Sequence, residues 1–199
     1  FMEQNEQMNN SQAQGNNWVE MSGWTKFLMV WLGLSCFGTI IINAVDIYQG
    51  MSELDKIPKE ILDQLNIMDS FHLMILGVVL YCAGYILTSV CSIISFYNRK
   101  PDAIYLARIA LISIVVINGV AVISSLISHD IDPQFKAIAR SLVFSVAWLV
   151  YLAKSKNIKD LFPPETRKNN AIPGYISIAL ILLGMFFAIW GTTNVYSME

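Results

Sequence analysis

Five apolar stretches, separated by polar or charged segments, dominate the sequence. A helix needs about 20 predominantly apolar residues to cross the hydrocarbon core of a bilayer. Only 14% of the residues are charged, compared with about 25% in a typical soluble domain. The sequence therefore predicts an all-α polytopic membrane bundle with five transmembrane helices. The stretches run approximately from Trp24 to Val45, Phe71 to Phe96, Ile104 to Ile127, Ala137 to Leu152 and Tyr175 to Tyr196.

The fourth stretch, from Ala137 to Leu152, is the shortest. It reaches spanning length if Phe135 and Tyr151 lie at the two membrane interfaces and the Arg140 side chain extends outward to water. The sequence leaves open whether this stretch crosses the bilayer completely.

Three parts of the chain differ in composition. Residues 1–21 are rich in Asn and Gln and nearly free of aliphatic side chains, which predicts a disordered polar tail that is not a signal peptide. Residues 22–162 contain the first four spans and are predicted to form a four-helix membrane core. Residues 163–199 add a cytoplasmic linker, in which Pro163 and Pro164 block helix continuation, and the fifth span.

Lysine and arginine are distributed unevenly between the connecting segments. In multi-pass proteins these residues accumulate in short loops on the cytoplasmic side. The asymmetry predicts a cytoplasmic N-terminus and a periplasmic or extracellular C-terminus. In that orientation the inner set is Lys26, Arg99, Lys100, Arg108, Lys154, Lys156, Lys159, Arg167 and Lys168, and the outer set is Lys56, Lys59, Lys136 and Arg140.

Three lysines, Lys154, Lys156 and Lys159, directly follow the shortest span. Their position favours a role as a topology signal that keeps the end of the fourth helix inside. The alternative is contact with anionic lipid head groups or with a protein partner.

The first outer loop contains a short helical pattern. Its apolar residues Ile57, Ile61, Leu65 and Met68 recur at helical spacing, and Pro58 suits a first helical turn. We expect a short amphipathic helix from about Pro58 to Met68, lying on the outer leaflet or capping the bundle.

Polar residues inside the spans are candidates for helix contacts. Asn118, in the middle of the third stretch, predicts a hydrogen bond to a neighbouring helix, with a substrate contact as the alternative. Small or polar residues also recur at every fourth position, which permits close approach of helix backbones. This pattern favours packing within one bundle, with the alternative that the fifth helix binds another subunit. The sets are Ser35-Thr39-Asn43, Gly84-Thr88-Ser92, Ala137-Ser141-Ser145 and Gly184-Ala188-Thr192.

No arrangement of residues in the sequence indicates a chemical reaction. The three cysteines lie in apolar stretches and form no C-x-x-C pair, which argues against a disulfide framework and a zinc site. His129, Asp130 and Asp132 share a short outer turn but lack a further metal ligand. We therefore expect no enzymatic activity, no metal, no cofactor and no nucleic-acid partner.

Two segments resemble the pattern of a known family. Ser22-Gly23-Trp24 opens the first span and is similar to a G-G-W-L start. The segment Trp148–Phe162, WLVYLAKSKNIKDLF, is similar to a closing W-x-x-Y-F-x-x-S-K-R-V-x-x-T-F. On these motifs the chain resembles an uncharacterised bacterial inner-membrane family, domain of unknown function 2569, over about Ser22 to Phe162.

The chain departs from that pattern in three places. Asn157 stands where the pattern has arginine, Asp160-Leu161 replaces the x-T pair, and the fifth span is an addition. The resemblance implies a bacterial cytoplasmic (inner) membrane protein with a four-helix core, and it carries no catalytic residue. We expect a membrane-embedded interaction or accessory subunit whose partners are the lipid bilayer and a membrane protein or a second copy. The alternative is an oligomeric small-molecule permease or channel.

Overall fold

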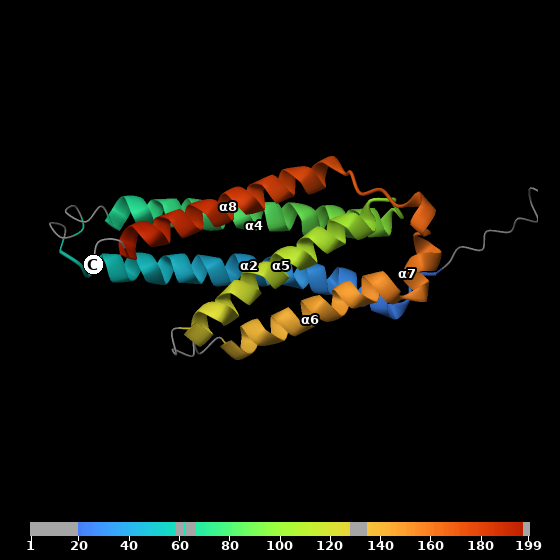
Figure 1. The fold of residues 1–199 in the computed structure, drawn as a ribbon, viewed down its shortest axis with the longest axis horizontal. Helices are drawn as coiled ribbons and strands as arrows, with labels where there is room; N and C mark the ends of the chain where they lie inside the picture. The colour runs from blue at the N-terminus through green and yellow to red at the C-terminus, as the bar shows by residue number, and fades with distance from the viewer. Residues whose placement is uncertain (1–19, 59–61, 63–66, 128–134, 197–199) are drawn as a thin grey trace, which may run out of the picture.

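The computed structural model describes residues 20–58, 62, 67–127 and 135–196. The described residues include five long helices, and each is long and apolar enough to cross a membrane. The all-α architecture with five candidate spans is therefore confirmed. The helices are α2 (Gly23–Leu54), α4 (Ile67–Tyr97), α5 (Ala103–Ile127), α6 (Phe135–Lys154) and α8 (Ile172–Tyr196) (Figure 1).

Helix α2 continues past Val45, where the apolar stretch ends, to Leu54. The segment after Val45 contains no proline before Pro58, so nothing interrupts the backbone hydrogen bonds. The helix has 32 residues, which corresponds to about 48 Å at 1.5 Å per residue. It is therefore longer than the hydrocarbon core, which is about 30 Å thick.

The fourth predicted stretch forms a helix of 20 residues, α6. This length is sufficient for a span because the helix includes Phe135 at one end and continues to Lys154 at the other. Ser155 then adopts an extended conformation and caps a new short helix, α7 (Lys156–Leu161), with its Oγ accepting from Ile158 N at 3.4 Å. The chain therefore turns at Ser155.

A proline-containing linker joins α7 to α8. Pro163 precedes a 3₁₀ turn, Pro164–Thr166. Pro173 lies in the first turn of α8, where the missing N–H group has no partner to lose. The helix can therefore begin at Ile172, three residues before Tyr175, which is the start predicted for the fifth span.

Helix α4 is the central helix of the bundle. It packs against α2, α5 and α8, whereas α6 packs against α5 (Figure 1). The most extensive of these contacts joins α4 to α8, which runs alongside it in the opposite direction. The fifth helix is therefore attached to the other spans mainly through α4.

The contact between α4 and α8 depends on glycine. A Cβ atom on Gly184 would lie 2.6 Å from Gly77 O, and a Cβ atom on Gly77 would overlap the backbone of Ala188. Only glycine allows such an approach, because any side chain would collide with backbone. Gly184 and Ala188 thus pack within the bundle, and the side chain of Thr192 lies outside the described residues.

Small residues repeat along this contact at every seventh position, about two helical turns. A Cβ atom on Gly84 would lie 2.8 Å from Ser177 O, and one on Gly191 would lie 2.6 Å from Ser70 O. The matched levels are Ser70 with Gly191, Gly77 with Gly184, and Gly84 with Ser177.

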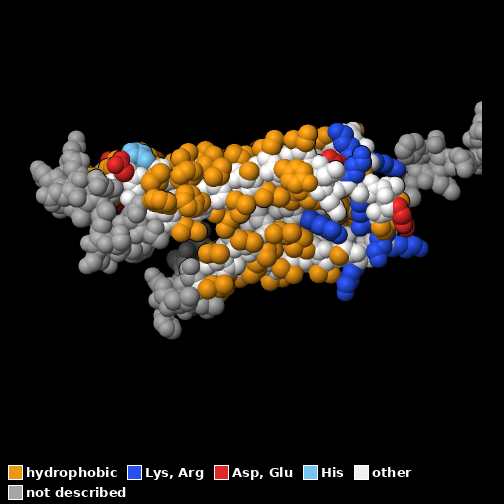
Figure 2. Space-filling view, turned by 45° about the horizontal axis from the view of Figure 1, so that its top comes forward, with side chains coloured by type: hydrophobic (Ala, Val, Ile, Leu, Met, Phe, Trp, Pro, Cys, Tyr) orange, Lys and Arg blue, Asp and Glu red, His pale blue; other side chains and the backbone are white. Residues whose placement is uncertain are grey.

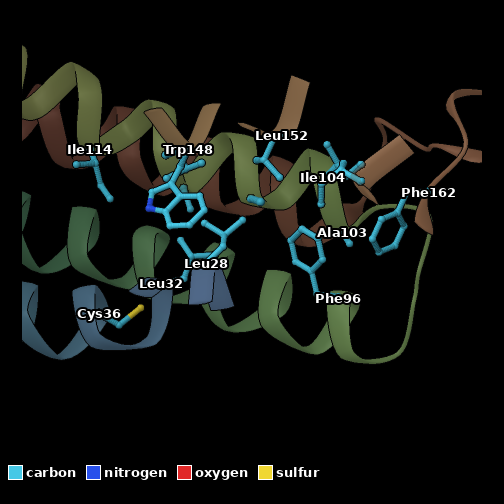
Figure 3. Packing of buried hydrophobic residues seen from close by; sticks show 14 of the residues in the cluster. Leu28, Leu32, Cys36, Phe96, Ala103, Ile104, Ile114, Trp148, Leu152 and Phe162 are labelled. Carbon is cyan, nitrogen blue, oxygen red and sulfur yellow. The ribbon is translucent and has the colours of Figure 1, made fainter. Parts of the chain in front are cut away.

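Buried apolar side chains from several helices meet near one end of the bundle. Leu28, Leu152 and Ile158 are completely buried there and belong to one cluster with Trp148. Figure 3 shows the Trp148 ring beside Leu28. Lys and Arg side chains gather at this same end, beside a broad apolar band (Figure 2). We call it the basic end; α7 and the exposed residues Lys100, Lys154 and Lys156 lie there.

Several predicted features fall on residues that the structure does not describe. The predicted amphipathic helix from Pro58 to Met68 lies largely outside the described residues; Leu62, within it, is buried. His129, Asp130 and Asp132 also lie outside them. Within the described ranges, no group of three potential ligands could hold a metal ion. The cysteines Cys36, Cys82 and Cys91 are free.

We expect Gly184→Leu to destabilise the protein by about 1–3 kcal/mol or more, because the added side chain meets backbone atoms of α4. Gly38→Leu is the matched control, since a Cβ atom on Gly38 would meet nothing within 4 Å. Thermal unfolding in mild detergent measures both. Equal melting temperatures for the two variants would contradict the close approach of α4 and α8.

Candidate functional site

The candidate site begins where α2 begins. Ser22 is the N-cap of α2, and its Oγ accepts from Thr25 N at 3.2 Å. The Thr25 side chain is completely buried, although it lies within the first helical turn. The predicted opening segment Ser22-Gly23-Trp24 therefore lies at the basic end, where Ser22 faces other parts of the chain and Trp24 is largely exposed.

Tyr151, from α6, joins the two hydroxyl groups at the start of α2. Its hydroxyl oxygen lies 3.0 Å from Ser22 Oγ and 3.0 Å from Thr25 Oγ1. The two α2 hydroxyls are themselves 3.1 Å apart. Each hydroxyl donates once, and Thr25 Oγ1 donates to Asn157 Oδ1. Ser22 and Tyr151 therefore supply the donors for two of the three hydroxyl contacts, which bind the start of α2 to the end of α6.

Asn157, in α7, completes this polar cluster. Its Oδ1 accepts from Ser22 N at 3.2 Å and from Thr25 Oγ1 at 3.1 Å. Its Nδ2 donates to Glu20 O at 3.0 Å. Arginine, which stands here in the pattern that the segment resembles, has only donors and cannot accept these hydrogen bonds. Asn157 therefore holds the chain before α2 in a way specific to this sequence.

An aromatic layer lies next to the polar cluster. Trp148 is 5% exposed, and its ring centroid lies 6.2 Å from Trp24, 5.7 Å from Phe27 and 5.6 Å from Tyr151. Its Nε1 is buried without a partner among the described residues. A buried donor without an acceptor costs about 1–3 kcal/mol, so the ring packing must offset this cost.

The end of the closing segment packs against α4. Phe162 is nearly completely buried and meets the Phe96 ring edge to face, with 5.4 Å between centroids (Figure 3). Ile158 is completely buried in the same cluster. The segment from Trp148 to Phe162 is thus in contact with the start of α2 through Trp148, Tyr151 and Asn157, and with α4 through Phe162.

The three lysines after the fourth span, Lys154, Lys156 and Lys159, are exposed. They surround the polar cluster without entering it, since its hydrogen bonds come from Ser22, Thr25, Tyr151 and Asn157. The structure thus leaves their head groups available to solvent, lipid or a partner.

Two of the predicted helix-contact residues, Asn118 and Ser92, form hydrogen bonds between helices. Asn118 Nδ2 donates to Ser141 Oγ at 3.0 Å, which joins α5 to α6. Ser92 Oγ donates to Ala103 O at 3.4 Å, which joins α4 to α5. The buried Thr88 hydroxyl instead bonds to Gly84 O at 3.1 Å within α4.

One contact in the middle of the bundle was not predicted. Ser35 Oγ, on α2, hydrogen-bonds to the hydroxyl of Tyr85, on α4, and the Tyr85 side chain is completely buried. A tyrosine in an apolar stretch indicates such a contact, because its hydroxyl needs a partner when buried. Ser35 was recognised only as a member of a small-residue set.

The arrangement defines a polytopic α-helical membrane protein in which two distant segments meet at the basic end. A family model described as a protein of unknown function, DUF2569, matches residues 19–163. The chain therefore belongs to this family, which confirms the resemblance seen in the two motifs. The match ends before α8. No curated protein and no solved structure matches the chain.

The polar cluster consists of hydroxyl groups, one amide and backbone groups. Among the described residues, no carboxylate, imidazole or thiol takes part in its hydrogen bonds. These groups hydrogen-bond the start of α2 to α6 and α7. The geometry therefore supports a role in holding these helices together.

We expect Tyr151→Phe to lower the free energy of unfolding by about 0.5–1.5 kcal/mol per hydrogen bond lost, because Ser22 and Thr25 lose a shared partner. Tyr97→Phe removes the same group from an exposed tyrosine and is the control. Thermal unfolding in detergent measures both. A Tyr151 variant as stable as the Tyr97 variant would show that the cluster contributes little.

Proposed function

We propose that this protein is a non-enzymatic accessory subunit of the bacterial cytoplasmic membrane, which acts by binding another membrane protein. The observation that carries the proposal is the use of polar groups inside the spans. Asn118 with Ser141, and Ser35 with Tyr85, form hydrogen bonds between helices. These hydrogen bonds stabilise the bundle. A solute pathway would need the same polar groups to contact the solute.

Other hydroxyls inside the spans bond to their own helices. Thr88, Ser113 and Ser145 each donate to a backbone carbonyl three or four residues earlier. A pathway for a polar solute requires such groups to face a water-filled space. Two pockets among the described residues lie at the two ends of the bundle, one at the α4–α5 turn and one between the end of α2 and the start of α4.

The surface that we assign to the partner is one face of α2. Leu34, Phe37 and Ile41 are 66%, 68% and 62% exposed and form a stripe along this helix. Gly38 lies within the stripe, and a Cβ atom there would meet nothing within 4 Å. A small residue on an exposed apolar face allows the backbone of another transmembrane helix to approach closely.

The orientation that we propose has the basic end in the cytoplasm and the end of α8 outside. Lys and Arg gather at the basic end (Figure 2), as they do on cytoplasmic faces. We expect alkaline phosphatase to be active when fused after Glu199 and inactive when fused after Lys168. Activity after Lys168 together with inactivity after Glu199 would reverse the orientation.

Photo-crosslinking in native membranes tests the partner surface. A photoreactive amino acid at Phe37 should yield a discrete adduct with a different membrane protein, identified by mass spectrometry. The same amino acid at Leu32, which is completely buried, is the control and should crosslink within the chain. Gly38→Leu should leave stability unchanged but weaken the Phe37 adduct, because it fills the space for a partner helix.

Adducts with lipid alone would contradict the accessory role. Adducts with a second copy of this chain would also contradict it and would favour an oligomeric permease or channel. In that case solute uptake by proteoliposomes becomes the next measurement.

A further inference from the structure

A second surface at the basic end joins segments that are distant in the sequence. Lys168 N, in the linker before α8, donates to Pro101 O, in the turn between α4 and α5, at 3.0 Å. Arg167 Nε donates to Phe162 O at 2.8 Å. These bonds hold the linker against the turn and give the surface a defined shape.

The α4–α5 turn has a strained backbone at its centre. Arg99 has a φ of 52°, in the left-handed region, which costs a non-glycine residue about 1–2 kcal/mol. Lys100 N then donates back to Ser95 O at 2.8 Å, which closes the end of α4. The chain reverses here, so that Lys100 and Asp102 lie beside the linker.

An open pocket of about 380 Å³ lies between the turn and the linker. An open pocket of this size has room for a phosphate group. Its lining residues are Lys100, Pro101, Asp102, Lys168, Asn170 and Ala171.

The surroundings of the pocket carry an excess of positive charge. Lys100 and Lys168 line it, with Asp102 as its one acidic lining residue. Arg167 directly precedes Lys168 in the linker. One of its terminal nitrogens, Nη2, is buried without a partner among the described residues. Burial, and then the nearby charge of Arg108, lower the pKa of the Arg167 guanidinium, whereas Glu165 raises it.

Two helices begin at the edge of this pocket. Asp102 directly precedes α5, and Ala171 directly precedes α8. The first N–H groups of a helix lack partners within the helix, and the helix dipole is positive at that end. Both features add to the lysines in favouring an anion.

We propose that this pocket binds the phosphate of an anionic phospholipid head group. The adjoining surface favours a lipid over free phosphate, because Ile172, Tyr175 and Ile176 at the start of α8 are exposed apolar side chains on which acyl chains can lie. The bound phosphate bridges Lys100 of the turn and Lys168 of the linker. Lipid binding thereby strengthens the attachment of α8, independently of any protein partner.

The test uses the purified full-length chain and compares phosphatidylglycerol with phosphatidylcholine. Native mass spectrometry measures retained lipid, and thermal unfolding measures stabilisation. We expect phosphatidylglycerol to be retained preferentially and to raise the melting temperature. The Lys100→Gln/Lys168→Gln double variant should retain at least about tenfold less phosphatidylglycerol, because it lacks two cations near the head group.

The Lys154→Gln/Lys156→Gln double variant is the matched control. It removes the same charge from exposed lysines at the same end that do not line the pocket. A Lys100→Arg/Lys168→Arg variant should restore retention, which excludes misfolding as the cause of a loss.

Three results would overturn the proposal. One is equal retention of the two lipids by the wild-type chain. Another is an equal loss in both glutamine variants, which would indicate general surface charge. The third is stabilisation by inorganic phosphate that matches the lipid, which would indicate a soluble anion instead.

Discussion

The close approach of α4 and α8 is the contact on which the rest of the structure depends. Lipid is as apolar as a leucine side chain, so the hydrophobic effect does not drive transmembrane helices together, and packing at short range must do so. Gly77 and Gly184 provide that packing, because their backbones meet where any Cβ atom would collide. With α8 fixed on α4, the linker before α8 is fixed against the α4–α5 turn through Lys168 and Pro101.

The basic end combines a part that lies within the family match with a part that lies beyond it. The polar cluster around Ser22, Tyr151 and Asn157 lies within the matched residues 19–163 and binds the first helix to the end of the fourth. The lysine-lined pocket depends on the linker that leads to α8, beyond the match. One end of the bundle thus has a core that orders the helices and a separate surface to which we propose that a lipid head group binds.

The sequence predicted the spans well because hydrophobicity and length determine them. It did not predict the end of α2 at Leu54, since a helix continues through polar residues when no proline intervenes. The two matched seven-residue repeats, with Gly77 on α4 and Gly191 on α8, were also not predicted. A single sequence does not show which faces of two helices meet. The segments around Ser22 and Tyr151 were recognised by resemblance, but their direct contact required the structure.

Site-specific photo-crosslinking between α4 and α8 tests the central claim most directly. Ile181, on α8, is 7% exposed, and its Cγ1 lies 2.9 Å from the position that a Cβ atom on Gly84, on α4, would occupy. A small photoreactive amino acid at Ile181 should therefore form adducts with α4 of the same chain, identified by mass spectrometry. The same amino acid at Leu182, which is 61% exposed, should not. Adducts of Ile181 with lipid, or equal labelling of α4 from the two positions, would contradict the packing described for α4 and α8.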